Sequence, residues 1–135
     1  MGIKWSDELS MFNQEIDDEH KRLIFLFNML NDEIVSQQRD QKNIQHILNL
    51  LLVDSIAHFS HEERLFAEKS YPNAEEHRLS HEKLVHEISQ AMKEIQRTDF
   101  VKDWVRIGLE IQQSLVDHLV LEDTQYIEYL RTDKP

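Results

Sequence analysis

The residues best suited to chemistry are histidines and carboxylates gathered in one stretch, HFSHEERLFAEKSYPNAEEHRLSH, which covers residues 58–81. Two pairs in it are spaced four apart, His58 with Glu62 and His77 with His81. On a helix, residues four apart lie one turn above each other on the same face, so both members of a pair can address one point. Imidazole-rich ligation suits iron, copper or zinc. The stretch therefore indicates a metal site, provided that it is helical.

Three more residues of the same chemical types, His20, His118 and Asp123, lie in other stretches with helical apolar spacing. The last two are five apart, which places them about 140° apart around an ideal helix. Either Asp123 reaches a shared site from the flank, or the helix widens locally, as π-type turns at functional sites do. The sequence alone leaves both arrangements open.

The elements that would position these residues are long helices, because the chain has only two glycines and two prolines in 135 residues. Apolar residues recur at helical spacing between the polar breaks SQQRDQ, SYPN and RTD. We predict helices over about 18–37, 41–68, 73–97 and 99–130. An N-terminal arm, residues 1–16, would attach through its apolar side chains, which are Trp5, Leu9, Met11, Phe12 and Ile16.

Capping residues set the expected helix starts. Asp17 is predicted to cap the first helix, Asn73 the third in a capping box with Glu76, and Thr98 or Asp99 the fourth. Connections of a few residues make successive helices antiparallel. The prediction is an all-α, up-down-up-down antiparallel four-helix bundle that forms one domain over residues 1–135.

In that topology all the candidate ligands fall at one end of the bundle. Without partners, each buried polar group would cost about 1–3 kcal/mol. A domain stable by only about 5–15 kcal/mol could not carry that cost for the whole set. The predicted metal ligands are His20, His58, Glu62, His77, His81, His118 and Asp123. We expect His46 and His86 on other faces, and His61 in a surface or supporting role beside the ligand face.

Composition and motifs exclude several other classes of protein. The net charge of −11 argues against nucleic-acid binding, and the absence of cysteine removes thiolate and iron–sulfur sites. No histidine has Glu three residues before it, so the Glu-x-x-His motif of ferritin-type centres is absent, as is HExxH. Without a run of about 18 apolar residues or an apolar signal core, no membrane span is expected and the cytoplasm is the expected location.

The segments DDEH, HFSHEE, YPNAEEHRLSH and HLVLED together resemble the hemerythrin family, in its single-domain bacterial form. The resemblance covers nearly the whole chain. It implies a non-haem centre of two iron ions with an oxo or hydroxo bridge. By it, His77, His81 and His118 would hold one iron and His20 and His58 the other. Both carboxylates would bridge the two ions, and the second iron would keep an open position.

The resemblance implies reversible dioxygen binding for storage, delivery or sensing, by a non-enzymatic and monomeric protein. Azide or nitric oxide would be further small ligands. Phe59 and Leu115 match dioxygen-pocket positions of the family, whereas Ser114 stands where hemerythrins commonly carry Trp. That change makes the closure of the pocket an open question. Two alternatives remain, namely a diiron enzyme acting on nitric oxide, peroxide or ferrous iron, and a sensor module that acts through a partner.

Overall fold

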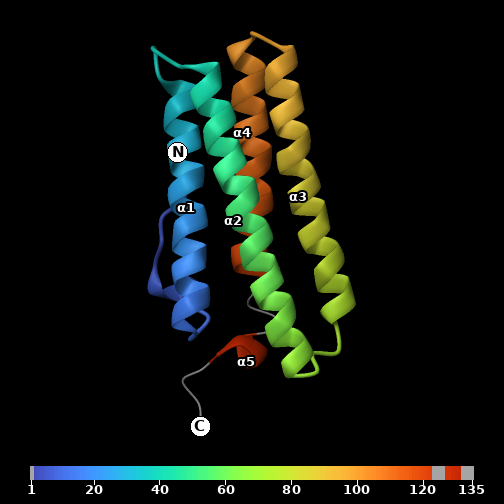
Figure 1. Cartoon of the computed structure of the whole chain (residues 1–135). Coiled ribbons are helices and arrows are strands. Elements are labelled where there is room, and N and C mark those ends of the chain that lie inside the picture. The colour runs from blue at the N-terminus through green and yellow to red at the C-terminus, as the bar shows by residue number, and fades with distance from the viewer. Residues whose placement is uncertain (1, 123–126, 132–135) are drawn as a thin grey trace.

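Four long helices form an antiparallel bundle in a computed structural model, which describes residues 2–122 and 127–131, apart from the side chains of residues 121, 122, 128 and 130. The helices are α1 (Gln14–Val35), α2 (Gln41–Glu68), α3 (Ala74–Arg97) and α4 (Val101–Val116). Each contacts its neighbour in the chain, and α1 also contacts α4, which closes the ring (Figure 1). No strand occurs in the described part of the chain. The predicted all-α four-helix bundle is therefore confirmed.

The start of α1 corrects the expected cap. Asn13, not Asp17, is the N-cap, and its side chain accepts a hydrogen bond from the Ile16 N–H. Asp17 lies one turn inside the helix and accepts from the Met11 N–H at 2.8 Å and from the Ser10 hydroxyl at 2.6 Å. Both residue types can cap a helix, but only the earlier start leaves Asp17 to satisfy the buried end of the arm. The helix predicted over 18–37 thus spans residues 14–35.

The arm before α1 is shorter than predicted and contains a short 3₁₀ turn, η1 (Asp7–Leu9). Met11 is fully buried, and Trp5 and Leu9 pack against the main core. Phe12, expected as an anchor, is instead 47% exposed and has a φ of 54°. Because the left-handed backbone there turns the chain into α1, the Phe12 ring points outward, where the Arg131 guanidinium lies over it.

The predictions for the two later caps hold only in part. Asn73 occupies the N-cap position of α3, as predicted, but its backbone, with φ −103° and ψ 23°, is not extended, and its side chain makes no capping bond. Before α4, the Thr98 hydroxyl accepts from the Phe100 N–H and donates to Asp103. Thr98 therefore fixes the turn, while Phe100 takes the N-cap position.

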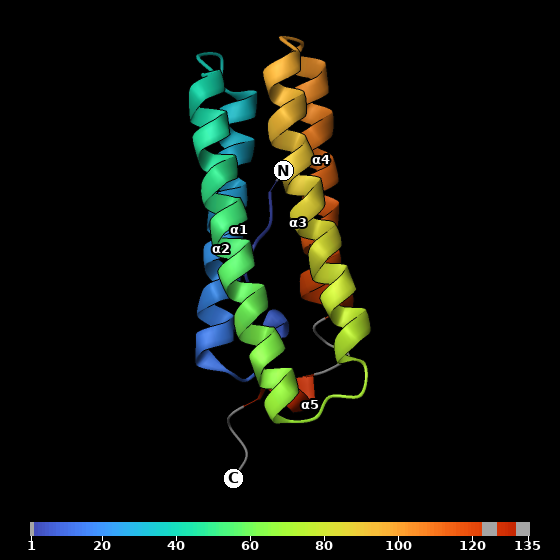
Figure 2. The same cartoon turned by 45° about the vertical axis from the view of Figure 1, so that its right-hand side comes forward.

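The fourth helix differs most from the single helix predicted over 99–130. Its regular part ends at Val116 and continues as a π-helix, η2 (Asp117–Glu122). A separate short helix, α5 (Ile127–Leu130), lies below the bundle end and contacts α2 (Figure 2). Ile127 and Tyr129 pack there against a small core of Met11, Ile16 and Phe66. Burial of this second apolar cluster explains why the chain leaves the direction of α4.

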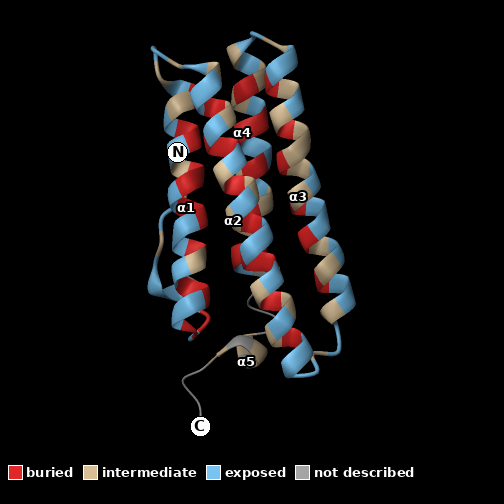
Figure 3. Cartoon of the chain, viewed as in Figure 1, coloured by how far each residue is buried: buried red, intermediate tan, exposed pale blue. Residues whose placement is uncertain are grey.

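Buried residues line the inner face of every long helix (Figure 3). The main core occupies the upper and middle levels between the four helices, and the small core closes the lower end. The candidate ligands lie between these two apolar layers. Among the described residues, no helix combines the length and apolar character that a membrane span requires.

Candidate metal centre

Glu62 lies at the middle of the candidate site. It comes from the last third of α2, and its side chain is fully buried. One carboxylate oxygen, Oε1, lies 3.1 Å from His81 Nε2, 3.4 Å from His58 Nε2 and 3.6 Å from His118 Nε2. The remaining two predicted histidines also face it, with His77 Nε2 3.9 Å from Oε1 and His20 Nε2 3.8 Å from Oε2. One carboxylate is thus surrounded by five imidazoles.

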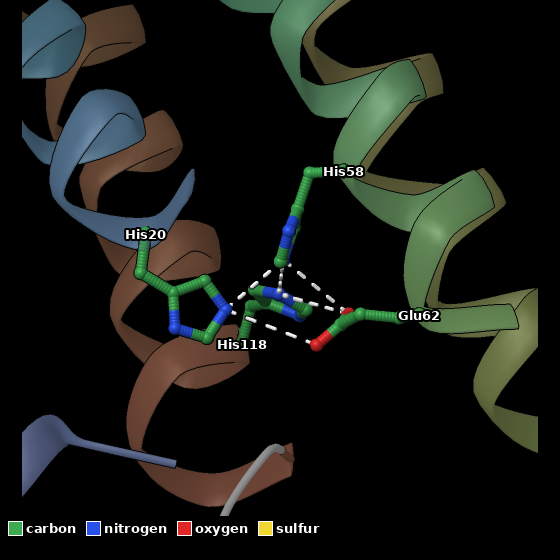
Figure 4. Close-up of side chains that lie close together, drawn as sticks. All are labelled: His20, His58, Glu62 and His118. Atoms are coloured by element: carbon green, nitrogen blue, oxygen red, sulfur yellow. Dashed lines mark hydrogen bonds and ion pairs between the residues drawn. The ribbon is translucent and has the colours of Figure 1, made fainter. Parts of the chain in front are cut away.

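Apart from His58, which also lies on α2, the other members of the cluster come from α1, α3 and the π-helix that follows α4. His20 comes from the first two turns of α1, His77 and His81 from the start of α3, and His118 from η2. Figure 4 shows the side chains of His20, His58, Glu62 and His118 pointing toward one another. The structure thus brings together six of the seven predicted ligands. Asp123 lies outside the described residues.

The π-helix bears on the spacing of His118 and Asp123. A π-type turn joins residues five apart, so it removes the angular offset that a regular α-helix would impose on an i,i+5 pair. Of the two arrangements that the sequence left open, the locally widened helix is present over Asp117–Glu122. The widening begins directly before His118, whose ring is 2% exposed.

The ligand atoms divide into two overlapping groups. His20, His58, Glu62 and His118 form one, and Glu62, His77, His81 and His118 form the other. Within each group the ligand atoms lie within 4.8 Å of one another. Glu62 and His118 belong to both groups. An imidazole turns one nitrogen toward the centre, whereas a carboxylate has two oxygens, so Glu62 is the member that can be shared between two ions.

The spacing of the nitrogens fits metal ligation. Two nitrogens bound at about 2.1 Å to one ion and at right angles lie about 3 Å apart. The Nε2 atoms of His20 and His58 are 3.0 Å apart. Buried imidazole nitrogens with a carboxylate oxygen are a ligand set for first-row transition metals. The type and spacing of these ligand atoms in the structure therefore fit a bound metal ion, independently of the sequence motifs.

Electrostatics leave these groups in the protonation states that metals need. Burial lowers the pKa of His81 to about 4 and also lowers the pKa of His58, so both imidazoles are neutral at pH 7. Burial raises the pKa of Glu62, but its interactions with the surrounding histidines lower it more, so the pKa lies well below its usual value. Neutral imidazole and ionised carboxylate are the forms that bind a metal ion without first losing a proton.

An apolar wall lies against one side of the cluster. The Phe59 ring stacks on His81, with ring centroids 4.0 Å apart and planes 8° apart. Phe59, Leu115 and Leu119 are all buried in the main core. Two of the predicted pocket residues, Phe59 and Leu115, are therefore buried and packed in the core.

Ser114 has a different environment from these two residues. Its hydroxyl donates to the Glu87 carboxylate on α3. Together with Leu84 and other residues it lines a cavity of about 70 Å³ that extends to His118. The lining is largely polar, with Ser80, Lys83 and Asp117 also taking part. A small polar opening between α3 and α4 thus reaches the edge of the cluster.

The carboxylates that support the histidines from outside were not predicted from the sequence. Glu19 Oε1 lies 2.6 Å from His58 Nδ1, and its Oε2 lies 2.7 Å from His61 Nδ1. Glu63 Oε2 lies 3.6 Å from His81 Nδ1. Each of these glutamates directly adjoins a predicted ligand in the chain, Glu19 beside His20 and Glu63 beside Glu62. That adjacency was the signal that could have identified them.

Five buried imidazoles and a buried carboxylate meet inside a four-helix bundle. This arrangement defines a metal-binding protein with a histidine-rich centre. The comparison with protein families agrees, because the family described as "Hemerythrin HHE cation binding domain" matches residues 11–130. The chain belongs to the hemerythrin family, and the buried cluster is its metal-binding site.

Three relatives show how far the similarity extends. The chain is 28% identical over 129 residues to the bacteriohemerythrin of Pseudomonas paraeruginosa, covering 96% of this chain and 82% of the relative. It is 25% identical over 129 residues to that of Stenotrophomonas maltophilia, with the same coverage of both chains. It is 28% identical over 123 residues to that of Campylobacter jejuni, with 90% of each chain covered.

Proposed function

We propose that this protein binds dioxygen reversibly at a centre of two iron ions, as a non-enzymatic storage, delivery or sensing protein. The observation that carries the proposal is the pair of overlapping ligand groups that share Glu62. One group by itself would suit a single ion, whereas two groups with a common carboxylate suit a bridged pair. Membership of the hemerythrin family and the name bacteriohemerythrin of the relatives support iron as the metal.

Membership of the hemerythrin family implies two unequal positions for the metal ions. His77, His81 and His118 would hold one iron, and His20 and His58 the other, with Glu62 and Asp123 bridging. The second iron then has one histidine fewer and keeps a position open, as ligand-binding metal sites require. Two iron ions would supply that open position and the electrons with which dioxygen is held.

The protein's own residues would keep the bound molecule from escaping. Phe59 stacks on His81 and covers one face of that ring. Leu115 and Leu119 are buried in the same core as Phe59. A dry wall limits protonation and loss of reduced dioxygen to solvent.

A second candidate function rests on the polar cavity between α3 and α4. Its lining of Lys83, Glu87, Ser114 and Asp117 could bring water or a proton to the edge of the cluster at His118. Such access favours turnover of a small molecule, so a diiron enzyme acting on nitric oxide, peroxide or ferrous iron is the alternative. A sensor module that acts through a partner would use the same reversible binding as the leading proposal.

The experiment that separates these functions is an anaerobic titration of the diferrous protein with dioxygen, followed by visible absorption. Reversible binding predicts a new absorption band that disappears when dioxygen is removed and returns on re-addition. A Glu62→Ala variant, which lacks the shared carboxylate, should show no such cycle. Irreversible oxidation in the parent protein, or repeated turnover with an electron donor, would contradict reversible binding and favour the enzyme.

A further inference from the structure

Glu19 connects a buried metal ligand to the protein surface. It directly precedes His20 on α1, but its carboxylate is directed at α2, where Oε1 lies 2.6 Å from His58 Nδ1 and Oε2 lies 2.7 Å from His61 Nδ1. The His58 side chain is 1% exposed, whereas those of His61 and Glu19 are 16% and 32% exposed. The Glu19 carboxylate therefore links the buried side chain of His58 to that of His61 in the cleft between α1 and α2.

The hydrogen bond to Glu19 decides which nitrogen of His58 carries the proton. A carboxylate can only accept, so His58 Nδ1 must donate to it. A neutral imidazole has one proton, which leaves a lone pair on His58 Nε2. That atom lies 3.0 Å from His20 Nε2 and 3.4 Å from Glu62 Oε1, and Figure 4 shows this edge of the ring facing the centre.

Glu19 is itself held from the outside. His61 Nδ1 donates to its second oxygen, and His61 Nε2 lies 3.5 Å from Glu15. Because both oxygens are occupied by imidazoles on α2, the plane of the carboxylate is fixed across the interface between α1 and α2. These contacts lie along a cleft of about 550 Å³ lined by both helices.

The corresponding support for His81 is weaker. Glu63 Oε2 lies 3.6 Å from His81 Nδ1, beyond a normal hydrogen bond. Instead, the ring of His81 is oriented by its stacking on Phe59. The two halves of the centre are thus supported differently, one by a hydrogen-bonded carboxylate and the other by packing.

We propose that Glu19, held by His61, is a positioning residue that fixes the tautomer and orientation of His58 and thereby the retention of the metal ion that His58 shares with His20. The proposal rests on the metal centre of the proposed function but not on its dioxygen chemistry. Carboxylates that hold a metal-bound histidine from outside typically contribute roughly 10–100-fold to metal affinity. The effect should be confined to one of the two ions.

The test is metal release from iron-loaded Glu19→Ala protein into excess chelator. We expect half of the iron to leave roughly 10–100-fold faster than from the parent protein. The other half should leave at the parent rate, so that release becomes biphasic. Glu19→Gln should fall between the two, because an amide oxygen can still accept from His58. Asp18→Ala is the matched control, since Asp18 lines the same cleft while its carboxylate accepts a hydrogen bond from the Gln14 side chain one turn earlier on α1.

A second variant tests whether His61 acts through Glu19. The double variant Glu19→Ala/His61→Ala should release iron no faster than Glu19→Ala alone, since the contact of His61 with the centre is already lost. Thermal unfolding of the chelator-treated proteins serves as a separate readout, and we expect Glu19→Ala and Asp18→Ala to differ little there. A purely structural role for Glu19 would lower stability without making release biphasic.

Failure of this proposal differs from failure of the proposed function. If the parent protein holds two irons and Glu19→Ala releases both as slowly as Asp18→Ala, the positioning role is overturned and the proposed function stands. If both ions leave equally fast from Glu19→Ala, the assignment to the ion at His20 and His58 is overturned. If the parent protein holds no iron, the proposed function fails, and the same comparison with zinc as the probe decides the role of Glu19.

Discussion

Acid should destabilise the chelator-treated protein because His81 is buried in its neutral form. Burial lowers the pKa of His81 from 6.5 to about 4 in the folded protein. As the pH falls below 6.5, the unfolded chain takes up a proton at this residue while the folded protein does not. Stability therefore falls between pH 6.5 and about 4, and no further loss comes from His81 below that range, where both states are protonated.

The size of the loss follows from the same two pKa values. At about 1.4 kcal/mol per pH unit, the interval from 6.5 to about 4 corresponds to about 3 kcal/mol. His58 is also neutral through burial, and the pKa of Glu62 is also lowered. The unfolded chain takes up a proton at each of these groups at a higher pH than the folded protein does, so both add to the loss of stability in acid. Against a total of about 5–15 kcal/mol, this loss is large.

Urea unfolding between pH 8 and 4 measures this effect. We expect the free energy of unfolding of the parent protein to fall steadily below pH 6.5. His81→Gln should have a shallower pH dependence, by about 1.4 kcal/mol per pH unit, because one linked proton is removed. His46→Gln, at an exposed position, should follow the parent curve. Equal stability of the parent at pH 7 and pH 4.5, or a parallel curve for His81→Gln, would refute the reasoning.

Three further predictions concern the loaded centre. Glu62→Ala should lose iron far more readily than His61→Ala, because Glu62 is fully buried among the histidines while His61 lies outside them; equal iron contents after dialysis would contradict this. Metal binding should slow amide hydrogen exchange most at the end of the bundle that holds the ligands, since binding energy at a site absent from the unfolded chain is folding energy, and uniform protection along all four helices would count against it. Ser114→Trp should cover the polar cavity at His118 and slow the decay of the oxygenated absorption band; decay as fast as in the parent would mean that Ser114 does not control access.

The bundle and the convergence of ligands could be predicted because both depend on periodicity. Residues with helical spacing define four faces, and short connections make the helices antiparallel. His20, His58, His77 and His118 then fall at one end whatever the details of packing. The structure places all four there, with exposed fractions between 0% and 6%.

Helix ends and supporting residues were harder to predict, since they depend on contacts between segments. Asp17 is a residue type that commonly caps helices, but its carboxylate instead accepts hydrogen bonds from Met11 and Ser10 of the arm. The fourth helix changes to a π-helix at Asp117, and the chain then returns to pack on α2 through α5. Glu19 supports His58 across the interface of α1 and α2, 39 residues apart in the chain. Local patterns carry little information on such tertiary contacts.

Elemental analysis of protein produced with ample iron, alongside the Glu62→Ala variant, determines whether the cluster around Glu62 holds two iron ions. We expect about two irons per chain in the parent protein, because two ligand groups share one carboxylate. The iron content of the variant should be strongly reduced. One iron per chain in the parent protein, or zinc in place of iron under these conditions, would contradict a centre of two iron ions.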